Sequence, residues 1–225
     1  SGVTGQLTFA LPPLSTLTRA DFFVSAANDA GLQAIDNWQN WPQGKLLLVG
    51  PSGSGKTHLA HIWATEAKAV IIEAAKLGTV DIANLGPHVV VENAEAIAGD
   101  QALETALFHL HNLTLPRGRL LVTAATPPRD WGLHLPDLYS RLQAAWLARL
   151  SPPDDALLTA VLIKLFSDRQ ITVAPNLIAY LAARIDRSIA AAQTIVATLD
   201  AHALAAARPI TRQLAAELLD SPQAQ

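Results

Sequence analysis

Eight consecutive residues form a pattern that binds phosphate groups in many proteins. The pattern is G-x-x-x-x-G-K-[ST], made here by Gly50, Pro51, Ser52, Gly53, Ser54, Gly55, Lys56 and Thr57. Glycines allow backbone N–H groups to turn inward around phosphate oxygens, and a helix that begins at the loop adds the positive end of its dipole. We predict that Lys56 contacts the β- and γ-phosphates and that Thr57 offers its hydroxyl to magnesium. The pattern therefore predicts a site for ADP or ATP with Mg²⁺.

The position of this loop favours phosphate binding over the alternative, an ordinary glycine-rich turn. The loop directly follows a strand-length apolar run, residues 45–49, and it opens a segment with helical spacing, residues 56–67. A strand, the glycine loop and a helix in this order form the P-loop. We therefore expect the loop to lie at the carboxyl end of a buried strand.

A P-loop needs a second acidic group at the end of a neighbouring strand, and the run His88–Glu92 supplies one. We predict that Glu92 holds magnesium, directly or through water. Asn93 occupies the position where an ATPase of this type often carries the carboxylate that orients the attacking water. Because an amide cannot take up a proton, we expect slow self-catalysed hydrolysis and bound ADP. The alternative is a buried strand that ends in two polar turn residues.

Strand-length apolar runs and helical segments share the first two thirds of the chain. The runs cover residues 45–49, 69–72, 88–92, 119–123 and 146–150, and the helical segments cover residues 27–38, 56–67, 100–113 and 137–145. Because the runs are continuous rather than alternating, they are typical of parallel strands buried on both faces. The order of strands and helices favours a three-layer α/β domain with a parallel sheet.

The pattern changes after Ser151, where two prolines precede helical segments only. These segments cover residues 154–166, 175–185, 188–206 and 211–219, and they predict a small all-α second domain. Its basic residues are balanced by acidic ones: Lys164, Arg169, Arg184, Arg187, Arg208 and Arg212 against Asp154, Asp155, Asp168, Asp186, Asp200, Glu217 and Asp220. We therefore expect no direct sequence-specific DNA binding. The expected borders are residues 1–20 for a tail, 21–151 for the α/β domain, 152–220 for the helical domain and 221–225 for a second tail.

Composition narrows the class of protein further. The chain has 225 residues, of which 50% are hydrophobic and 16% are charged, and its formal net charge is −3. These values indicate a folded globular protein rather than a disordered one. The unbroken apolar runs are much shorter than the ~20 residues that cross a bilayer, so we expect no membrane segment. Cysteine is absent, which fits a reducing compartment and a cytoplasmic location.

The loop, the strand ending at Glu92 and the helical C-terminal region together resemble the AAA+ module of the bacterial replication initiator DnaA. The resemblance runs from about Asp21 to Leu219. It implies that residues 21–151 form a P-loop AAA+ nucleotide-binding domain and that residues 152–220 form its all-α lid.

Three further segments carry this resemblance. Residues 21–24 with Asn28 resemble the segment that leads into the family's module, which implies that Phe23 and Val24 line the adenine pocket. Residues 123–129 are similar to the strand end and turn called sensor 1. Residues 138–142 resemble the segment with the arginine finger, which implies that Arg141 enters a neighbour's site and stabilises charge on the transferring phosphoryl group. Without the resemblance, Arg141 would be interpreted as a solvated helix arginine in a surface ion pair.

Within this family the chain is most similar to the Hda type, the DnaA-related regulators that switch the initiator off. About 20 residues precede the module, and the sequence stops after the lid, whereas DnaA carries an N-terminal interaction domain and a C-terminal helix-turn-helix domain that reads origin DNA. The resemblance implies two partners, DnaA and the sliding clamp of the replicative polymerase, and it leaves self-association open. It implies that the protein promotes hydrolysis of DnaA-bound ATP and so prevents re-initiation.

The tail contains a peptide that fits the clamp. Residues 6–11 resemble the Q-L-x-apolar-x-L peptide with which this type binds the sliding clamp, and the side chains implied in binding are Gln6, Leu7, Phe9 and Leu11. An extended peptide with spaced apolar anchors can enter a surface groove. The alternative is an N-terminal strand that packs on its own domain.

The sequence also departs from the family at two sensor positions. Ala125 stands where sensor 1 usually has Asp, and Ala190 stands where the sensor 2 Arg is expected. Arg187 lies nearby in sequence but on another face of the helix. These departures concern nucleotide sensing and hydrolysis rather than phosphate binding. They weigh against one alternative function, an independent P-loop ATPase, while the balanced charge of the helical domain weighs against another, a helicase-loader-like protein or truncated initiator that acts on DNA.

Overall fold

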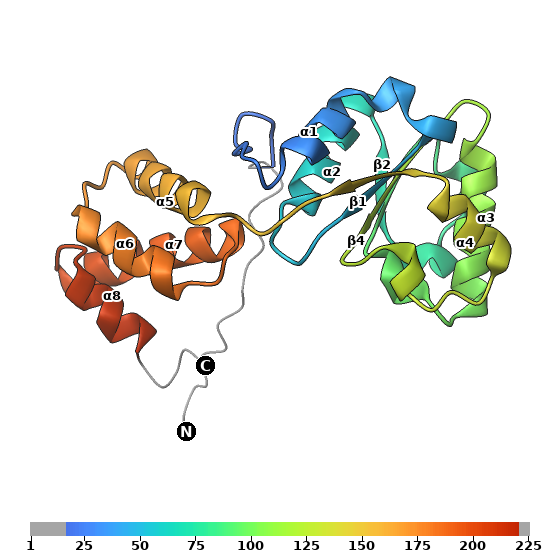
Figure 1. The fold of residues 1–225 in the computed structure, drawn as a ribbon. Helices are drawn as coiled ribbons and strands as arrows, with labels where there is room; N and C mark the ends of the chain where they lie inside the picture. The colour runs from blue at the N-terminus through green and yellow to red at the C-terminus, as the bar shows by residue number, and fades with distance from the viewer. Residues whose placement is uncertain (1–16, 221–225) are drawn as a thin grey trace. The chain divides into compact units, whose positions relative to one another are not determined.

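The computed structural model describes residues 17–220, which form two units, residues 17–152 and residues 153–220 (Figure 1). The tail residues 6–11 lie outside the described residues, so their predicted clamp contact stays a prediction. The first unit contains, in chain order, α1 (Asp29–Asp36), β1 (Lys45–Val49), α2 (Lys56–Ala67), β2 (Val70–Glu73), β3 (His88–Glu92), α3 (Gln101–Thr114), β4 (Arg119–Ala124), α4 (Pro136–Gln143) and β5 (Trp146–Arg149). Short 3-10 turns connect them, among them η6 (Ala94–Ile97) after β3.

The five strands form one parallel sheet in the order β2-β3-β4-β1-β5. The predicted α/β fold is therefore confirmed. β4 lies between β1 and β3, so the ends of these three strands meet at one edge. The prediction that all five strands are buried on both faces is wrong for β2 and β5, which are only partly buried because they form the two borders of the sheet. Val70 of β2, for example, is 43% exposed.

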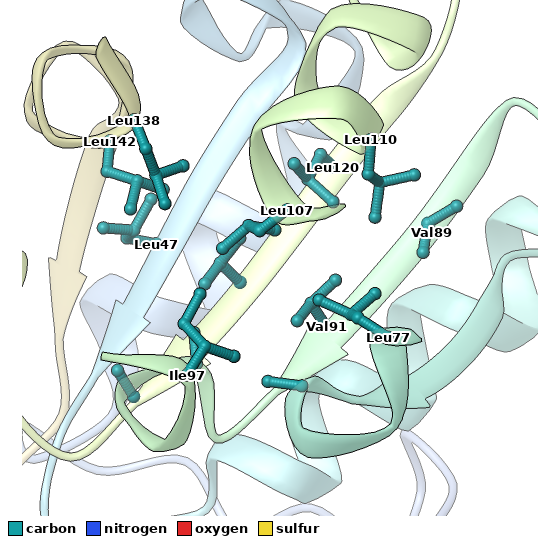
Figure 2. Close-up of a cluster of buried hydrophobic side chains, with 14 of the residues drawn as sticks. Leu47, Leu77, Val89, Val91, Ile97, Leu107, Leu110, Leu120, Leu138 and Leu142 are labelled. Atoms are coloured by element: carbon teal, nitrogen blue, oxygen red, sulfur yellow. The ribbon is translucent and has the colours of Figure 1, made fainter. Parts of the chain in front are cut away.

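Successive residues of β1 face opposite sides of the sheet and pack into two separate clusters. Leu47 and Val49 face the cluster under α3 and α4, and Figure 2 shows Leu138 and Leu142 of α4 over Leu47. Leu46 and Leu48 face the cluster under α1 and α2. Figure 1 shows the two helix pairs on opposite faces of the sheet. This three-layer packing holds β1 rigid, and with it the loop that follows Val49.

A buried carboxylate ties α3 to the segment that leads into α4. Glu104 is fully buried, and it accepts hydrogen bonds from the backbone N–H groups of Gly99 (2.9 Å), His134 (2.8 Å) and Leu135 (2.9 Å). Burial disfavours the charged form, but the backbone hydrogen bonds outweigh it, so the pKa of Glu104 is lowered from its ordinary value. Glu104 thereby fixes the path of the chain before α4.

Replacing Glu104 with Gln is expected to reduce the free energy of unfolding by about 2 kcal/mol at pH 7, because charge-assisted hydrogen bonds are lost and an NH₂ group faces a backbone donor. A lowered folded-state pKa gives stability that is present above the unfolded value of 4.5 and is lost as the pH falls through the folded value. The difference between wild type and E104Q, measured by urea unfolding, should therefore shrink below that pH. D186N, at an exposed position of the second unit, is the control; a pH-independent difference would contradict this account.

The second unit contains α5 (Asp155–Asp168), α6 (Pro175–Arg184), α7 (Ile189–Ala206) and α8 (Arg212–Leu219), in agreement with the predicted all-α region. Asp154, Ser188 and Thr211 cap α5, α7 and α8 by accepting backbone N–H groups of the first turn. Within residues 17–220, α7 alone has the length and mean hydropathy, 1.3, of a membrane-spanning helix. Its side chains Ile195, Val196 and Leu199 are buried within the unit. A core helix meets the same criteria, so this finding is weak evidence for a membrane span.

Candidate nucleotide-binding site

The predicted phosphate loop lies between β1 and α2, with glycines where the backbone needs them. Gly53 and Gly55 have φ values of 79° and 101°, which favour glycine. At Gly50 a Cβ atom would lie 2.6 Å from the carbonyl oxygen of Leu150 and 2.7 Å from Ser54 Oγ. The Gly50 N–H donates to the carbonyl oxygen of Ala124 at the end of β4, at 3.1 Å. The loop is therefore anchored to the neighbouring strand end.

Two polar groups of the loop are arranged as a phosphate site requires. The Lys56 ammonium donates to the carbonyl oxygens of Gly50 and Pro51, the latter at 3.2 Å. Burial lowers the pKa of Lys56, and the charges of Glu95 and Glu92 act against that shift. Ser54 is 4% exposed, and its Oγ has no hydrogen-bond partner. A buried hydroxyl without a partner is costly unless a ligand or water satisfies it. These groups fit the oxygens of a bound phosphate chain.

Thr57 and Glu92, the predicted magnesium pair, lie together at the loop. The Thr57 side chain hydrogen-bonds Glu92, which is 7% exposed, and Glu92 Oε1 has no partner. Burial raises the pKa of Glu92, and Glu73 adds to the rise, while the bond to Thr57 and the charge of Lys56 oppose it. Among residues 17–220 no group of three or more His, Cys, Asp or Glu side chains is placed to hold a metal. A hydroxyl and one carboxylate nevertheless fit Mg²⁺, which takes its remaining oxygens from phosphates and water.

Two further carboxylates lie close to Glu92 or Lys56, Glu73 to the former and Glu95 to the latter, and sequence analysis missed both. Glu73, at the end of β2, accepts a hydrogen bond from the Asn93 side chain at 3.0 Å. Glu95, in η6, accepts a hydrogen bond from the backbone N–H of Ala125 at 3.2 Å. Asn93 itself has a positive φ of 57°, and its N–H donates to Thr123 Oγ1 at 3.1 Å. The only signal in the sequence was that acidic residues stand at or just after predicted strand ends, where parallel strands bring them to one edge.

The segment before α1 reaches the loop through Phe22. The Phe22 ring meets the His58 ring edge to face, with centroids 5.1 Å apart, and a Cβ built on Gly55 would lie 3.5 Å from Phe22. Phe23, one of the two predicted adenine contacts, accepts a hydrogen bond at its carbonyl oxygen from the Asn28 side chain, at 2.6 Å. The second, Val24, is 53% exposed. Asn28 therefore shapes this segment, and the Phe22 ring lies beside the P-loop.

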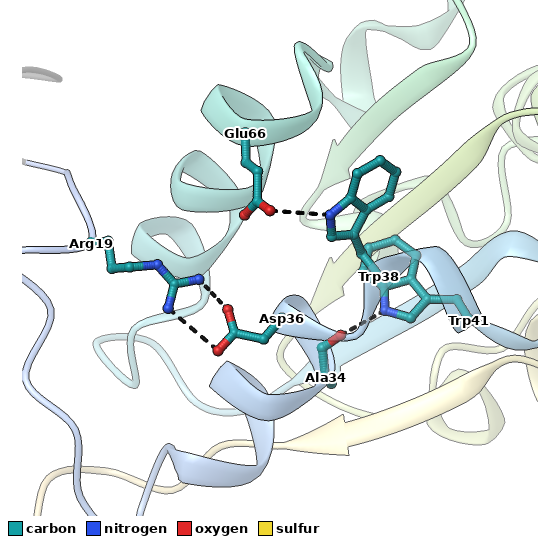
Figure 3. Close-up of polar contacts among 6 residues, drawn as sticks. All are labelled: Arg19, Ala34, Asp36, Trp38, Trp41 and Glu66. Carbon is teal, nitrogen blue, oxygen red and sulfur yellow. Dashed lines mark hydrogen bonds and ion pairs between the residues drawn. The ribbon is translucent and has the colours of Figure 1, made fainter.

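An ion pair and two indole hydrogen bonds hold this region in place (Figure 3). Arg19 pairs with Asp36 of α1. The Trp41 indole donates to the carbonyl oxygen of Ala34 at 2.7 Å, and the Trp38 indole donates to Glu66 of α2 at 3.4 Å. The ion pair fastens the segment before α1 to α1, and the two indole hydrogen bonds fasten the turn after α1 to α1 and α2.

The fold is shared with proteins of known structure, although no protein-family model matches the sequence. Domain III of the replication initiation protein DnaA from Thermotoga maritima aligns with a TM-score of 0.77, at 19% identity, over 94% of this chain and 98% of that chain. The chain has the AAA+ fold of DnaA domain III. DnaA from Aquifex aeolicus bound to AMPPCP aligns with a TM-score of 0.70 at 16% identity, over 82% of this chain and 65% of that chain. The Holliday junction branch migration motor RuvB of Thermotoga maritima aligns with a TM-score of 0.69 at 17% identity, over 92% of this chain and 72% of that chain.

The arginine predicted to act as a finger lies away from the P-loop. Arg141 is exposed in the last turn of α4, whose Leu138 and Leu142 are buried. It lies close enough to Lys45 and His111 to affect both: burial first, then Arg141, lowers the pKa of Lys45 to about 8, and burial, Lys45 and Arg141 together lower the pKa of His111 to about 4. Lys45 begins β1, whereas the P-loop follows the end of β1. Arg141 therefore lies toward the opposite edge of the sheet.

The two sensor departures take different forms. At sensor 1, Ala125 offers only its backbone, and the bond from Ala125 N–H to Glu95 brings a carboxylate to this position. In the helical unit, Ala190 is exposed in the first turn of α7, and Arg187 pairs with Asp155 at 2.7 Å. Arg187 is thus held by an acidic neighbour within its own unit.

Proposed function

We propose that this protein is a nucleotide-binding regulator of chromosomal replication initiation. It binds ADP or ATP with Mg²⁺, docks on the sliding clamp through residues 6–11 and promotes hydrolysis of DnaA-bound ATP through Arg141, which limits re-initiation. The observation that carries the proposal is the combination of a phosphate loop at one edge of the sheet with an exposed Arg141 toward the other.

This arrangement favours action on a second molecule. The five residues of β1 separate Lys45 from the loop by roughly 16 Å, and Arg141 lies at the Lys45 end. An arginine placed there does not serve its own loop but is presented to a neighbour. An arginine supplied in trans stabilises charge on the transferring phosphoryl group. The shared fold with DnaA supports DnaA as that neighbour, since like domains can stack head to tail.

The helical unit supports a protein partner rather than DNA. Lys164, Arg169, Arg187 and Arg208 form ion pairs with Asp168, Asp200, Asp155 and Glu217. Arg184 and Arg212 lie over the Tyr180 ring, at 3.7 and 5.0 Å from its centroid. Cations engaged in this way form no basic surface for phosphate contacts.

The test is a reconstituted reaction. We expect hydrolysis of DnaA-bound ATP to rise when this protein, ADP and DNA-loaded clamp are all present, and to return to the basal rate without clamp. Joint replacement of Gln6 and Leu7 with alanine should have the same effect as omitting the clamp, because two of the four side chains implied in binding are lost. T8A, at a variable position of the peptide, should leave the stimulation unchanged. Stimulation that persists without clamp would contradict the role of the tail, and stimulation absent under all conditions would contradict the proposed function.

A further inference from the structure

One carboxylate oxygen beside the P-loop is buried and forms no hydrogen bond in the fold. Glu95 Oε2 is shielded from solvent and has no hydrogen-bond partner, while Glu95 Oε1 accepts the N–H of Ala125. Ser54 Oγ and Glu92 Oε1, at the same site, are also buried without partners. Three such atoms around one loop indicate that the site is built for a polar ligand.

The position of Glu95 follows from a short series of backbone contacts. Gly50, the first residue of the loop, donates to the carbonyl oxygen of Ala124. The next residue, Ala125, donates to Glu95. Of the two carboxylates whose charge raises the pKa of Lys56, Glu95 has the larger effect. Glu95 is therefore held at the end of β4, beside the lysine expected to contact the terminal phosphates.

The other polar side chains at this edge are less suited to take a proton from water. Asn93 is an amide and cannot accept one. Glu73 is exposed and already accepts from Asn93. Glu92 hydrogen-bonds Thr57 and belongs to the expected magnesium site. Glu95 keeps one oxygen fixed by the backbone and the other free.

We propose that Glu95 is the general base for hydrolysis of this protein's own ATP. The water oxygen forms a bond to the γ-phosphorus while the bond from that phosphorus to the β,γ-bridging oxygen breaks. One proton of the water passes to Glu95 Oε2, and the bridging oxygen keeps the electron pair and leaves with ADP. The products are ADP and phosphate. This inference rests on the nucleotide binding in the proposed function, but not on DnaA or the clamp.

The test compares E95Q with E73Q in the full-length chain. Glutamine keeps an oxygen for the Ala125 N–H but cannot take up a proton. With protein in excess over Mg·ATP, we expect E95Q to lower the single-turnover rate by about 10²- to 10⁴-fold, so that bound ATP stays intact. E73Q removes a nearby carboxylate of the same charge and should change the rate by less than about threefold. ADP affinity and the melting temperature of the nucleotide-free protein should match wild type in both variants.

Several outcomes would overturn the proposal. These are wild-type protein that binds ATP but does not hydrolyse it, equal rates for wild type and E95Q, and a rate loss in E73Q alone, which would assign the base to Glu73. Weakened ADP binding or a lowered melting temperature in E95Q would make Glu95 structural. Stimulation of DnaA, measured with ADP and clamp, should be the same for E95Q and wild type. If neither protein stimulated DnaA, the proposed function would be contradicted. The role of Glu95 would then be decided by the single-turnover rates alone.

Discussion

Replacing Arg141 with alanine is expected to abolish the stimulation of DnaA-bound ATP hydrolysis, with a loss of roughly 10³- to 10⁵-fold in the stimulated rate. The loss is large because no other group of this protein would replace an arginine that stabilises the transition-state charge. Arg141 is exposed, and the neighbouring Leu138 and Leu142 supply the packing of α4. The free energy of unfolding of the variant should therefore lie within about 0.5 kcal/mol of the wild-type value. The measurement is phosphate release from DnaA-ATP with ADP and loaded clamp.

Arg129 provides the matched control. It is an exposed arginine of the same unit whose nearest acidic group is Asp130, at 3.9 Å. R129A removes the same charge from the surface and should keep full stimulation. Clamp binding and ADP binding should be unchanged in both variants. Full stimulation by R141A would remove Arg141 from the mechanism, and equal losses in both variants would indicate a general effect of surface charge.

Replacing Lys56 with alanine is expected to weaken ADP and ATP binding by about 10²- to 10³-fold, which is the size of effect seen when one partner of a desolvated charge pair is removed. The Lys56 ammonium lies at the loop on the carbonyl oxygens of Gly50 and Pro51. A phosphate chain would attract it away from these neutral acceptors. Titration calorimetry with ADP measures the loss directly.

A second lysine provides a control that separates the effect of losing a positive charge from the effect of losing it at the loop. Lys76 is exposed and follows β2, so K76A changes net charge equally without touching the loop. ADP affinity should be unchanged in K76A. If K56A also bound ADP as wild type does, the phosphate assignment of the loop would be wrong.

The sequence predicted the central elements well because they are buried on both faces. The ranges of β1, β3 and α2 in the structure match the predicted ones. Continuous apolar runs identify such strands, and the glycine loop fixes where α2 begins. The border strands were predicted in the right place but with the wrong burial, because strand order is not visible in a single sequence.

The site was predicted less completely than the fold. Lys56, Thr57 and Glu92 belong to recognisable motifs, and the structure brings them together. Glu95 escaped prediction because its hydrogen-bond partner, Ala125, is 30 residues away in sequence and contributes only its backbone. Phe22 escaped because neighbouring Phe23 matched the family's pattern, whereas the approach of Phe22 to Gly55 is visible only in the folded chain.

The insertion of β4 between β1 and β3 has a consequence for synthesis of the protein. β1 pairs only with β4 and β5, and both are synthesised long after it. Lys45, for example, has no strand partner until Leu120 has been synthesised. The loop anchor, from Gly50 to Ala124, is equally late. Folding of this unit therefore cannot proceed strictly from the N-terminus, and nascent β1 is an unpaired apolar strand until β4 has been made. Because the loop is anchored to β4, we expect nucleotide to stabilise this unit only after β4 has joined β1.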